Sequence, residues 1–200
     1  MFFVVRKGRW ALVLTAFFSF CAGAQNPNLC AACHGDGGNS TSAGVPSIAG
    51  QPRTFLENQM ILFREELRPS DQMLPVVKGM RDPEIIALAK HFSALPAKPV
   101  VSGAPDKDLM QAGQAAAKKL RCGVCHVSDF SGQNQVPRLA LQREEYLLSE
   151  MKAYRDGKRK GADTIMAAAL YGVSDADLTA LAHYLSRIAT PKGKPPARAR

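Results

Sequence analysis

The stretch CAACH at residues 30–34 returns as CGVCH at residues 122–126, so one signature, C-x-x-C-H, occurs twice in 200 residues. Two cysteines three positions apart lie on the same side of a helical turn. The histidine that follows the second cysteine extends from the same turn. Both sulfurs can therefore bind the edge of one flat ligand while the histidine reaches beneath its plane.

The two signatures belong to an internal duplication. VPSIAGQPRTFL (45–56) aligns with VPRLALQREEYL (136–147), and GMRDPEIIALAKHFSAL (79–95) aligns with GVSDADLTALAHYLSRI (172–188). The offset between the copies stays between 91 and 93, so the chain holds two related units in tandem. Units of this size bury little apolar core and often need a cofactor for stability.

The C-x-x-C-H spacing is typical of c-type haem attachment, in which the cysteine sulfurs bind the haem edge and the histidine binds the iron. Two copies predict two covalently attached haem c groups. The attachment residues are then Cys30, Cys33, Cys122 and Cys125, and the proximal iron ligands are His34 and His126.

Three other interpretations of the signature are weaker. A zinc site needs four Cys or His ligands, whereas each signature supplies three. A redox dithiol is expected between a strand and a helix, and no stretch of this sequence alternates as a strand. Chance explains one copy but not two copies inside aligned repeats.

The N-terminus has the three parts of an export signal. Arg6, Lys7 and Arg9 form a positive region, Trp10–Phe20 is apolar, and small residues at 22–24 precede a cut at Gln25. We therefore expect residues 1–24 to be a signal peptide and the protein to be periplasmic. The alternative is an uncleaved membrane anchor.

Cleavage also simplifies the cysteine count and leaves a basic chain. Cys21 leaves with the signal, so the four remaining cysteines all belong to the signatures, which suits an oxidising compartment. The full chain carries 26 basic and 17 acidic residues, and the signal contains three of the basic ones. A basic surface favours partners with acidic docking surfaces.

The second axial ligand of each iron should recur in both units. His91 and His183 do not align with one another, whereas Met73 aligns with Met166. Both methionines lie in loose segments nine residues before the Asp at the start of the last helix of their unit. We predict Met73 and Met166 as the distal ligands, with a thioether that raises the reduction potential.

Other methionines fit a structural role better. Met60 and Met151 also align, but they lie on the apolar stripes of amphipathic helices and are expected in the core. Met80 is a second candidate for the first iron, although its repeat partner is Val173. The choice between Met73 and Met80 stays open at this point.

The rest of the sequence predicts helices, and the second unit begins with one, at residues 106–122, that the first unit lacks. Asp82 is expected to cap the last helix of the first unit, and Ser174 that of the second. The expected divisions are a signal (1–24), a first domain (25–96), a linker (97–107), a second domain (108–190) and a basic disordered tail (191–200).

Residues 28–190 resemble the diheme cytochrome c4 family, through C-x-x-C-H, V-P-x-[IL]-A, a late methionine and a final D-x-x-[IL]-x-x-L-A helix. The resemblance implies an all-α protein of two tandem class I cytochrome c domains, each wrapped around one haem. Leu141, in LALQ, stands where the family pattern has glycine, and this replacement is expected to alter a local turn.

The resemblance also implies a function. The protein would carry single electrons from a cytochrome bc complex or a dehydrogenase to a terminal oxidase, without an enzymatic activity of its own. The alternative is a haem-bearing subunit of a periplasmic dehydrogenase complex. A diheme peroxidase needs an open iron, which paired methionines disfavour. We expect the partners to be redox proteins, with peripheral association with a membrane as a further possibility. We expect no binding of nucleic acid and no small-molecule substrate.

The loop YRDGKRKGAD (154–163) concentrates basic residues before the second late methionine. Arg155, Lys158, Arg159 and Lys160 are expected to form either a solvated loop or a docking patch for an acidic partner.

Overall fold

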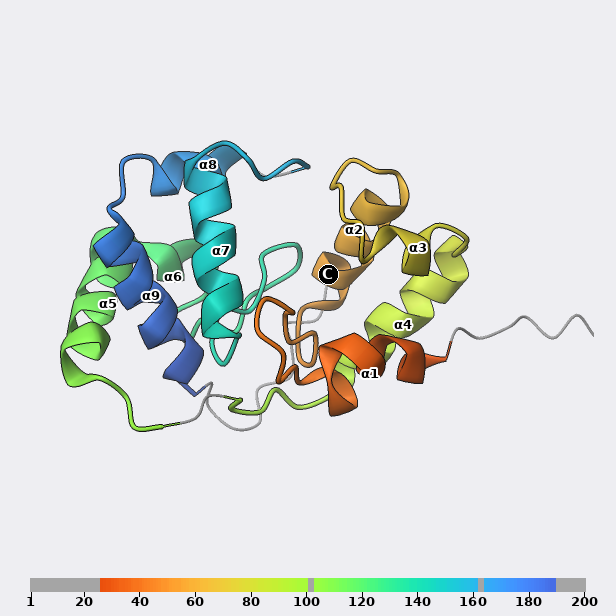
Figure 1. Ribbon diagram of the computed structural model, residues 1–200, viewed down its shortest axis with the longest axis horizontal. Coiled ribbons are helices and arrows are strands. Elements are labelled where there is room, and N and C mark those ends of the chain that lie inside the picture. Colours follow the sequence, from red (N-terminus) through yellow and green to blue (C-terminus); the bar gives the residue numbers. More distant parts are fainter. Residues whose placement is uncertain (1–25, 101–102, 162–163, 190–200) are drawn as a thin grey trace, which may run out of the picture.

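Helices form all the regular secondary structure in the computed structural model, which describes residues 26–100, 103–161 and 164–189 (Figure 1). No β-strand occurs within these ranges, so the all-α expectation is confirmed. In chain order the elements are α1 (Pro27–His34), the 3-10 helix η1 (Asp36–Gly38), α2 (Arg53–Arg64), α3 (Leu74–Val77), α4 (Asp82–Ala94), α5 (Lys107–Lys119), α6 (Cys122–Cys125), α7 (Glu144–Arg155), α8 (Thr164–Leu170) and α9 (Asp175–Arg187).

The helices form two groups, one from each half of the sequence (Figure 1). Each group has its own hydrophobic cluster. The first cluster consists of Leu56, Val77, Met80, Ile85, Leu88, Ala89 and Phe92. The second consists of Ala116, Ala117, Phe130, Ala140, Leu147, Met151, Leu170, Leu178, Leu181, Ala182 and Leu185. The domain boundaries named above stay predictions, and residues 1–24 and 191–200 lie outside the described residues.

The second group is held together by the crossing of α5 and α9. Gly113 lies at the crossing, where an added Cβ would come within 2.2 Å of the Ala180 carbonyl oxygen. Only glycine lets the two backbones approach this closely. Asp106 caps α5 by accepting hydrogen bonds from the backbone N–H groups of Asp108 (2.9 Å) and Leu109 (3.0 Å).

The described part of the first group has no counterpart of α5. Helix α1 is eight residues long, begins after Asn26 and contains the first C-x-x-C-H stretch itself. The asymmetry expected from the sequence is therefore present in the described residues.

Both final helices begin where the sequence indicates, but one cap differs. The Ser174 hydroxyl accepts a hydrogen bond from the Asp177 N–H (3.1 Å), as expected. The prediction that Asp82 caps α4 is wrong, because the helix begins at Asp82 itself and Arg81 is the cap residue. The Glu84 carboxylate accepts the Arg81 N–H (2.7 Å), which leaves Asp82 to pair with Arg64 (2.8 Å).

A charged cluster joins α7 to α9. Glu144 pairs with Arg187, and one of its carboxylate oxygens lies 3.2 Å from His183 Nδ1. Nε2 of His183 accepts the Asp106 N–H (3.0 Å), so Nδ1 carries the ring proton and donates to Glu144. Burial opposes ionisation of Glu144, but the hydrogen bonds from Arg187 and His183 outweigh it and hold its pKa below the usual value.

This cluster predicts an acid-sensitive contribution to stability. A carboxylate whose pKa is lowered by folding stabilises the protein above its unfolded pKa, about 4.3, and that contribution disappears as the pH falls through the folded pKa. Glu144→Gln should therefore unfold more easily than the parent at neutral pH, with the gap closing below about pH 4. Thermal unfolding followed by circular dichroism across this range measures the gap. The matched control is Glu145→Gln, whose side chain is 53% exposed; an equal and constant gap in both variants would contradict the prediction.

No single helix among the described residues is long and apolar enough to cross a membrane. Helices α8 and α9 meet the length and composition test only as a pair, and they are bent by 115° relative to one another.

Candidate haem sites

The first C-x-x-C-H stretch occupies the end of α1. Cys30 is partly buried against the first hydrophobic cluster, Cys33 is exposed, and both thiols are free. His34 is 8% exposed, and its Nδ1 lies 2.8 Å from the Pro46 carbonyl oxygen. The helix ends at Gly35 (φ 79°), where a Cβ would lie 2.2 Å from the Asn39 carbonyl oxygen. This turn folds the following loop back over the histidine.

The second C-x-x-C-H stretch has the same residue types, but its backbone conformation differs from that of the first. Arg121 adopts a left-handed conformation (φ 57°) that breaks α5 from α6, which carries Cys122 and Cys125. Cys122 is partly buried against the second cluster and Cys125 is exposed. His126 is 7% exposed, with Nδ1 2.9 Å from the Pro137 carbonyl oxygen.

In each repeat, the carbonyl that meets the histidine belongs to the proline of the shared V-P dipeptide. A carbonyl oxygen only accepts, so Nδ1 of each ring carries the proton and Nε2 keeps its lone pair. Burial lowers the pKa of His34 and of His126, which favours the neutral ring. A neutral imidazole with a fixed orientation and a free Nε2 is the form that binds iron.

The residues present fit haem c. Each signature offers two free thiols on one helical turn, with one of them facing a hydrophobic cluster and the other facing outward. In the ranges that the structure describes, no three His, Cys, Asp or Glu side chains group closely enough to bind a metal ion. The geometry of the described residues therefore does not support the zinc alternative. Attachment of haem c requires only two thiols and one histidine, and each signature supplies them.

The late methionines border the same clusters as the cysteines. Met73 precedes α3 and packs against the first cluster, as Cys30 does. Met166 packs against the second cluster, as Cys122 does, but it lies in helix α8 and not in the loose segment expected from the sequence. Both side chains are only partly buried. Their assignment as iron ligands stays a prediction.

The remaining methionines and histidines are used otherwise. Met80 is 4% exposed inside the first cluster, and Met151 is 7% exposed inside the second. Met60 packs against the first cluster from α2. His183 is held by Asp106 and Glu144, and His91 is exposed on α4.

The loops that follow the two histidines meet each other through two glutamines. The side-chain amide of Gln142 accepts the Ser47 N–H (2.7 Å) and donates to the Ser47 carbonyl (2.9 Å). Gln51 does the same with Arg138, at 2.9 and 3.0 Å. Each glutamine thus pairs with the residue four positions before its own repeat partner, which gives the contact an approximate two-fold symmetry. The sequence carried a signal for it, namely glutamine at the same place in both repeats.

Leu141 keeps the turn that glycine makes in the first repeat. Gly50 has φ 63° and Leu141 has φ 58°, and the Leu141 side chain is 6% exposed. The expectation that leucine alters this turn is wrong. The left-handed backbone costs about 1–2 kcal/mol for a residue with a Cβ, and burial of a leucine side chain contributes about 1.5–3 kcal/mol, so burial offsets the strain.

Substitutions at Leu141 should reverse the usual order of alanine and glycine. Leu141→Ala loses most of the burial and keeps the strain, whereas Leu141→Gly loses the burial and relieves the strain. We expect the glycine variant to be the more stable of the two by about 1 kcal/mol. Chemical denaturation of both variants measures the difference. At Leu185, which lies inside α9 and is 1% exposed, alanine should remain better than glycine; the same order at both positions would refute the proposed strain.

The basic loop is only partly available to a partner. Arg155 pairs with Asp156 and Asp175, and Arg159 pairs with Glu150 while its guanidinium lies 5.1 Å from the centre of the Tyr154 ring. Both arginines are only partly exposed, and these ion pairs leave less of their charge available to a partner. Lys158 and Lys160 are exposed.

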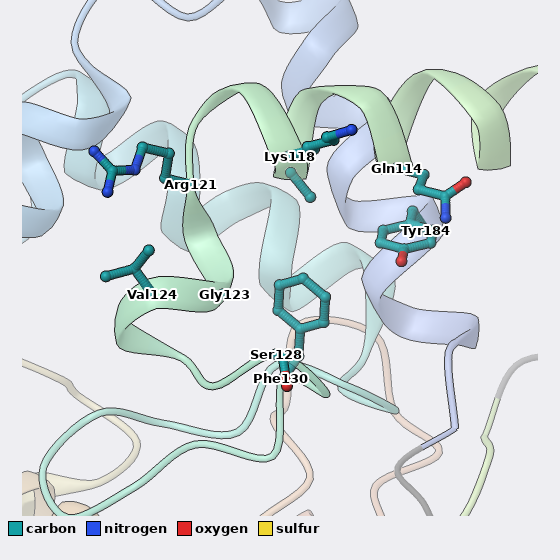
Figure 2. A pocket seen from close by; sticks show the side chains of 9 residues that line it. Gln114, Lys118, Arg121, Gly123, Val124, Ser128, Phe130 and Tyr184 are labelled. Atoms are coloured by element: carbon teal, nitrogen blue, oxygen red, sulfur yellow. The ribbon is translucent and has the colours of Figure 1, made fainter.

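A cavity of roughly 420 Å³ lies beside the second signature (Figure 2). Gly123 and Val124 form one side of it, and the rings of Phe130 and Tyr184, which meet edge to face, form another. None of the cysteines, histidines or late methionines lines this cavity, although Gly123 and Val124 lie between the two signature cysteines.

The helical fold and the paired signatures define a c-type cytochrome. The sequence model of the family described as Cytochrome c matches residues 110–189. The electron acceptor of thiosulfate dehydrogenase from Thiomonas intermedia is 31% identical over 88% of this chain and 86% of its own length. Cytochrome c4 from Thiocapsa roseopersicina is 28% identical over 81% of this chain and 88% of its own length.

Solved structures agree with the sequences. Reduced recombinant cytochrome c4 from Pseudomonas stutzeri matches with a TM-score of 0.74 and 25% identity, over 80% of this chain and 94% of that chain. The chain belongs to the diheme cytochrome c4 family: it has tandem class I cytochrome c domains, binds two haem c groups and transfers electrons.

Proposed function

We propose that this protein carries single electrons between respiratory complexes in the periplasm, and that each of its two irons is closed on both faces by protein ligands. The observation that carries the proposal is the repeated histidine geometry, in which a loop carbonyl fixes each ring and leaves Nε2 free. The proposed attachment residues are Cys30, Cys33, Cys122 and Cys125, and the proposed axial ligands are His34, Met73, His126 and Met166.

Haem c supplies an iron that accepts and releases one electron. The protein's own residues determine how that happens. The carbonyls of Pro46 and Pro137 hold the histidine rings and increase their basicity. The two hydrophobic clusters keep water away from one side of each site, and soft thioether sulfur favours the reduced state. With both faces of the iron filled, no position is left for a substrate, which suits a carrier.

The location and division of the chain belong to the same proposal. Export by residues 1–24 would place the protein in the periplasm. This compartment is oxidising, so disulfides form and persist there and spare thiols are a liability. Residues 25–96 and 108–190 would form the two haem domains, joined by 97–107. The contacts from Gln51 and Gln142 would hold the domains together, so that electrons can pass between the haems.

The partners are proposed to be redox proteins with acidic docking surfaces, attracted by the basic charge of the chain. Lys158 and Lys160 are the exposed cations of the loop before Met166. One relative is described as the electron acceptor of thiosulfate dehydrogenase, which favours a dehydrogenase as the donor. It also keeps a dehydrogenase subunit as the second candidate function.

Stopped-flow reduction tests this proposal. Holoprotein is mixed with thiosulfate and the thiosulfate dehydrogenase of Thiomonas intermedia, and haem reduction is followed by absorbance. We expect reduction that depends on the dehydrogenase and slows at high salt, and that slows further in Lys158→Glu/Lys160→Glu at low salt. The matched control is Lys90→Glu on α4, which should leave the rate unchanged. If the haems are not reduced, the dehydrogenase is excluded as the donor. If the rate depends neither on salt nor on the two lysines, the proposed docking surface is excluded.

A further inference from the structure

Arg138 is a positive charge buried between the two groups of helices. It follows Pro137 in the loop of the second repeat and is 3% exposed. One Nη donates to the Ala49 carbonyl of the first repeat (2.9 Å), and the other donates to the Ala140 carbonyl of its own loop. Its backbone N–H donates to Gln51 (2.9 Å). The residue therefore contacts both repeats through its main chain and its side chain.

No acidic group compensates this charge in the part of the chain that the structure describes. Its side-chain hydrogen bonds go to carbonyl oxygens, and its buried Nε has no partner. Burial alone lowers the pKa of Arg138 to about 10, with no contribution from a neighbouring charge. The guanidinium remains protonated at neutral pH, because that pKa lies well above 7. The electrostatic interaction of an unpaired charge with a second charge at a given distance is stronger in a buried site than in water, because the effective dielectric constant is lower.

The Arg138 side chain contacts equivalent loops of the two repeats. Ala49 and Ala140 are repeat partners, so the guanidinium bridges equivalent carbonyls of the two repeats. Ala49 lies three residues after Pro46, which holds His34, and Ala140 lies three residues after Pro137, which holds His126. The same two loops thus hold both histidines and the Arg138 guanidinium. The equivalent residue of the first repeat is Ser47, so the duplication supplies one charge and not two.

We propose that Arg138 is a positive charge common to both haem sites and that it raises the reduction potential of both haems. Adding an electron to either iron lowers the positive charge of that site, and a nearby cation that no carboxylate of the described residues neutralises favours this change. The sharing also means that a single substitution should move both potentials in the same direction. This inference rests on the proposed function, because it assumes two haems held beside these loops.

The test is a potentiometric titration of holoprotein followed by absorbance. Arg138→Met keeps much of the side-chain volume and removes the charge. We expect both potentials to fall, each by about a tenfold change in the one-electron equilibrium constant, which corresponds to 59 mV. Arg138→Lys keeps the charge and should shift both potentials by less than half as much. Arg138→Gln also lacks the charge but retains an amide donor for the Ala49 carbonyl, so it serves if the methionine variant does not fold.

Gln142→Leu is the matched control for the interface. It removes the equivalent loop contact, that with Ser47, without changing charge or touching Arg138. Its potentials should stay near those of the parent. If Gln142→Leu moves the potentials as far as Arg138→Met does, the effect comes from the domain contact and the inference is overturned. Unchanged potentials in the neutral variants, or a shift at only one haem, overturn it as well. The absorption spectrum of the oxidised protein distinguishes failure of this inference from failure of the proposed His/Met ligation. Without methionine ligation, the methionine-to-iron charge-transfer band in the red part of the spectrum is missing.

Discussion

The double variant Cys122→Ala/Cys125→Ala should retain one covalently attached haem instead of two. Both thioether bonds of the second site disappear, while Cys30 and Cys33 in α1 still offer free thiols beside the first hydrophobic cluster. The first group of helices has its own core, so we expect it to keep its haem. Mass spectrometry of the acid-denatured protein measures the number of haems per chain directly.

The reciprocal variant and an unrelated cysteine complete this test. Cys30→Ala/Cys33→Ala should also retain one haem, held by the second site. Cys21→Ala should retain two, because Cys21 is the only cysteine outside the two signatures. Two covalent haems in either double variant, or none in both, would contradict independent attachment at the two sites.

Met73→Ala should lower the reduction potential of one haem by on the order of 100 mV and leave the other nearly unchanged. Removing the thioether takes away a ligand that favours reduced iron, and water or a nitrogen ligand in its place favours the oxidised state. The oxidised protein should lose about half of its methionine-to-iron absorption band, and the altered haem should bind carbon monoxide when reduced. Met166→Ala should have the same effect on the other haem.

Met80 provides the matched control, since it is the competing candidate in the first unit. Met80→Leu replaces a side chain that is 4% exposed in the first cluster with another apolar one of similar volume. It should leave the absorption band and both potentials in place. If Met80→Leu removes the band and Met73→Ala does not, the distal ligand of the first haem is Met80.

Most of the architecture follows from local sequence patterns. Ser174 was expected to cap the last helix of the second unit, and its hydroxyl caps α9 in the structure. The proline whose carbonyl meets each histidine recurs in both repeats, 12 and 11 residues after the histidine. These features depend on residues close together in sequence, so pattern and spacing are enough to reveal them.

Contacts between the repeats were harder to foresee. The pairing of Gln51 with the backbone of Arg138 joins residues 87 apart, and the glutamine repeated in both units does not reveal which distant residue it contacts. Burial of Arg138 is similar, because arginine in a loop is usually exposed. Arg155 and Arg159 also looked like unpaired surface charges, and only the placement of Glu150 and Asp175 beside them shows that they are paired within the fold. The prediction that Asp82 caps α4 was wrong for a local reason. The helix begins at Asp82, and Glu84 accepts the backbone N–H of the cap residue, Arg81.

Titration of the fully reduced holoprotein with carbon monoxide, followed by absorbance, tests most directly whether both irons are closed on their second face. If Met73 and Met166 fill those faces, the Soret band should stay unchanged at neutral pH for both haems, and the Met73→Ala variant should bind one equivalent. A shift of the Soret band in the unaltered protein would show an open iron and contradict the role of this chain as a carrier with two His/Met haems.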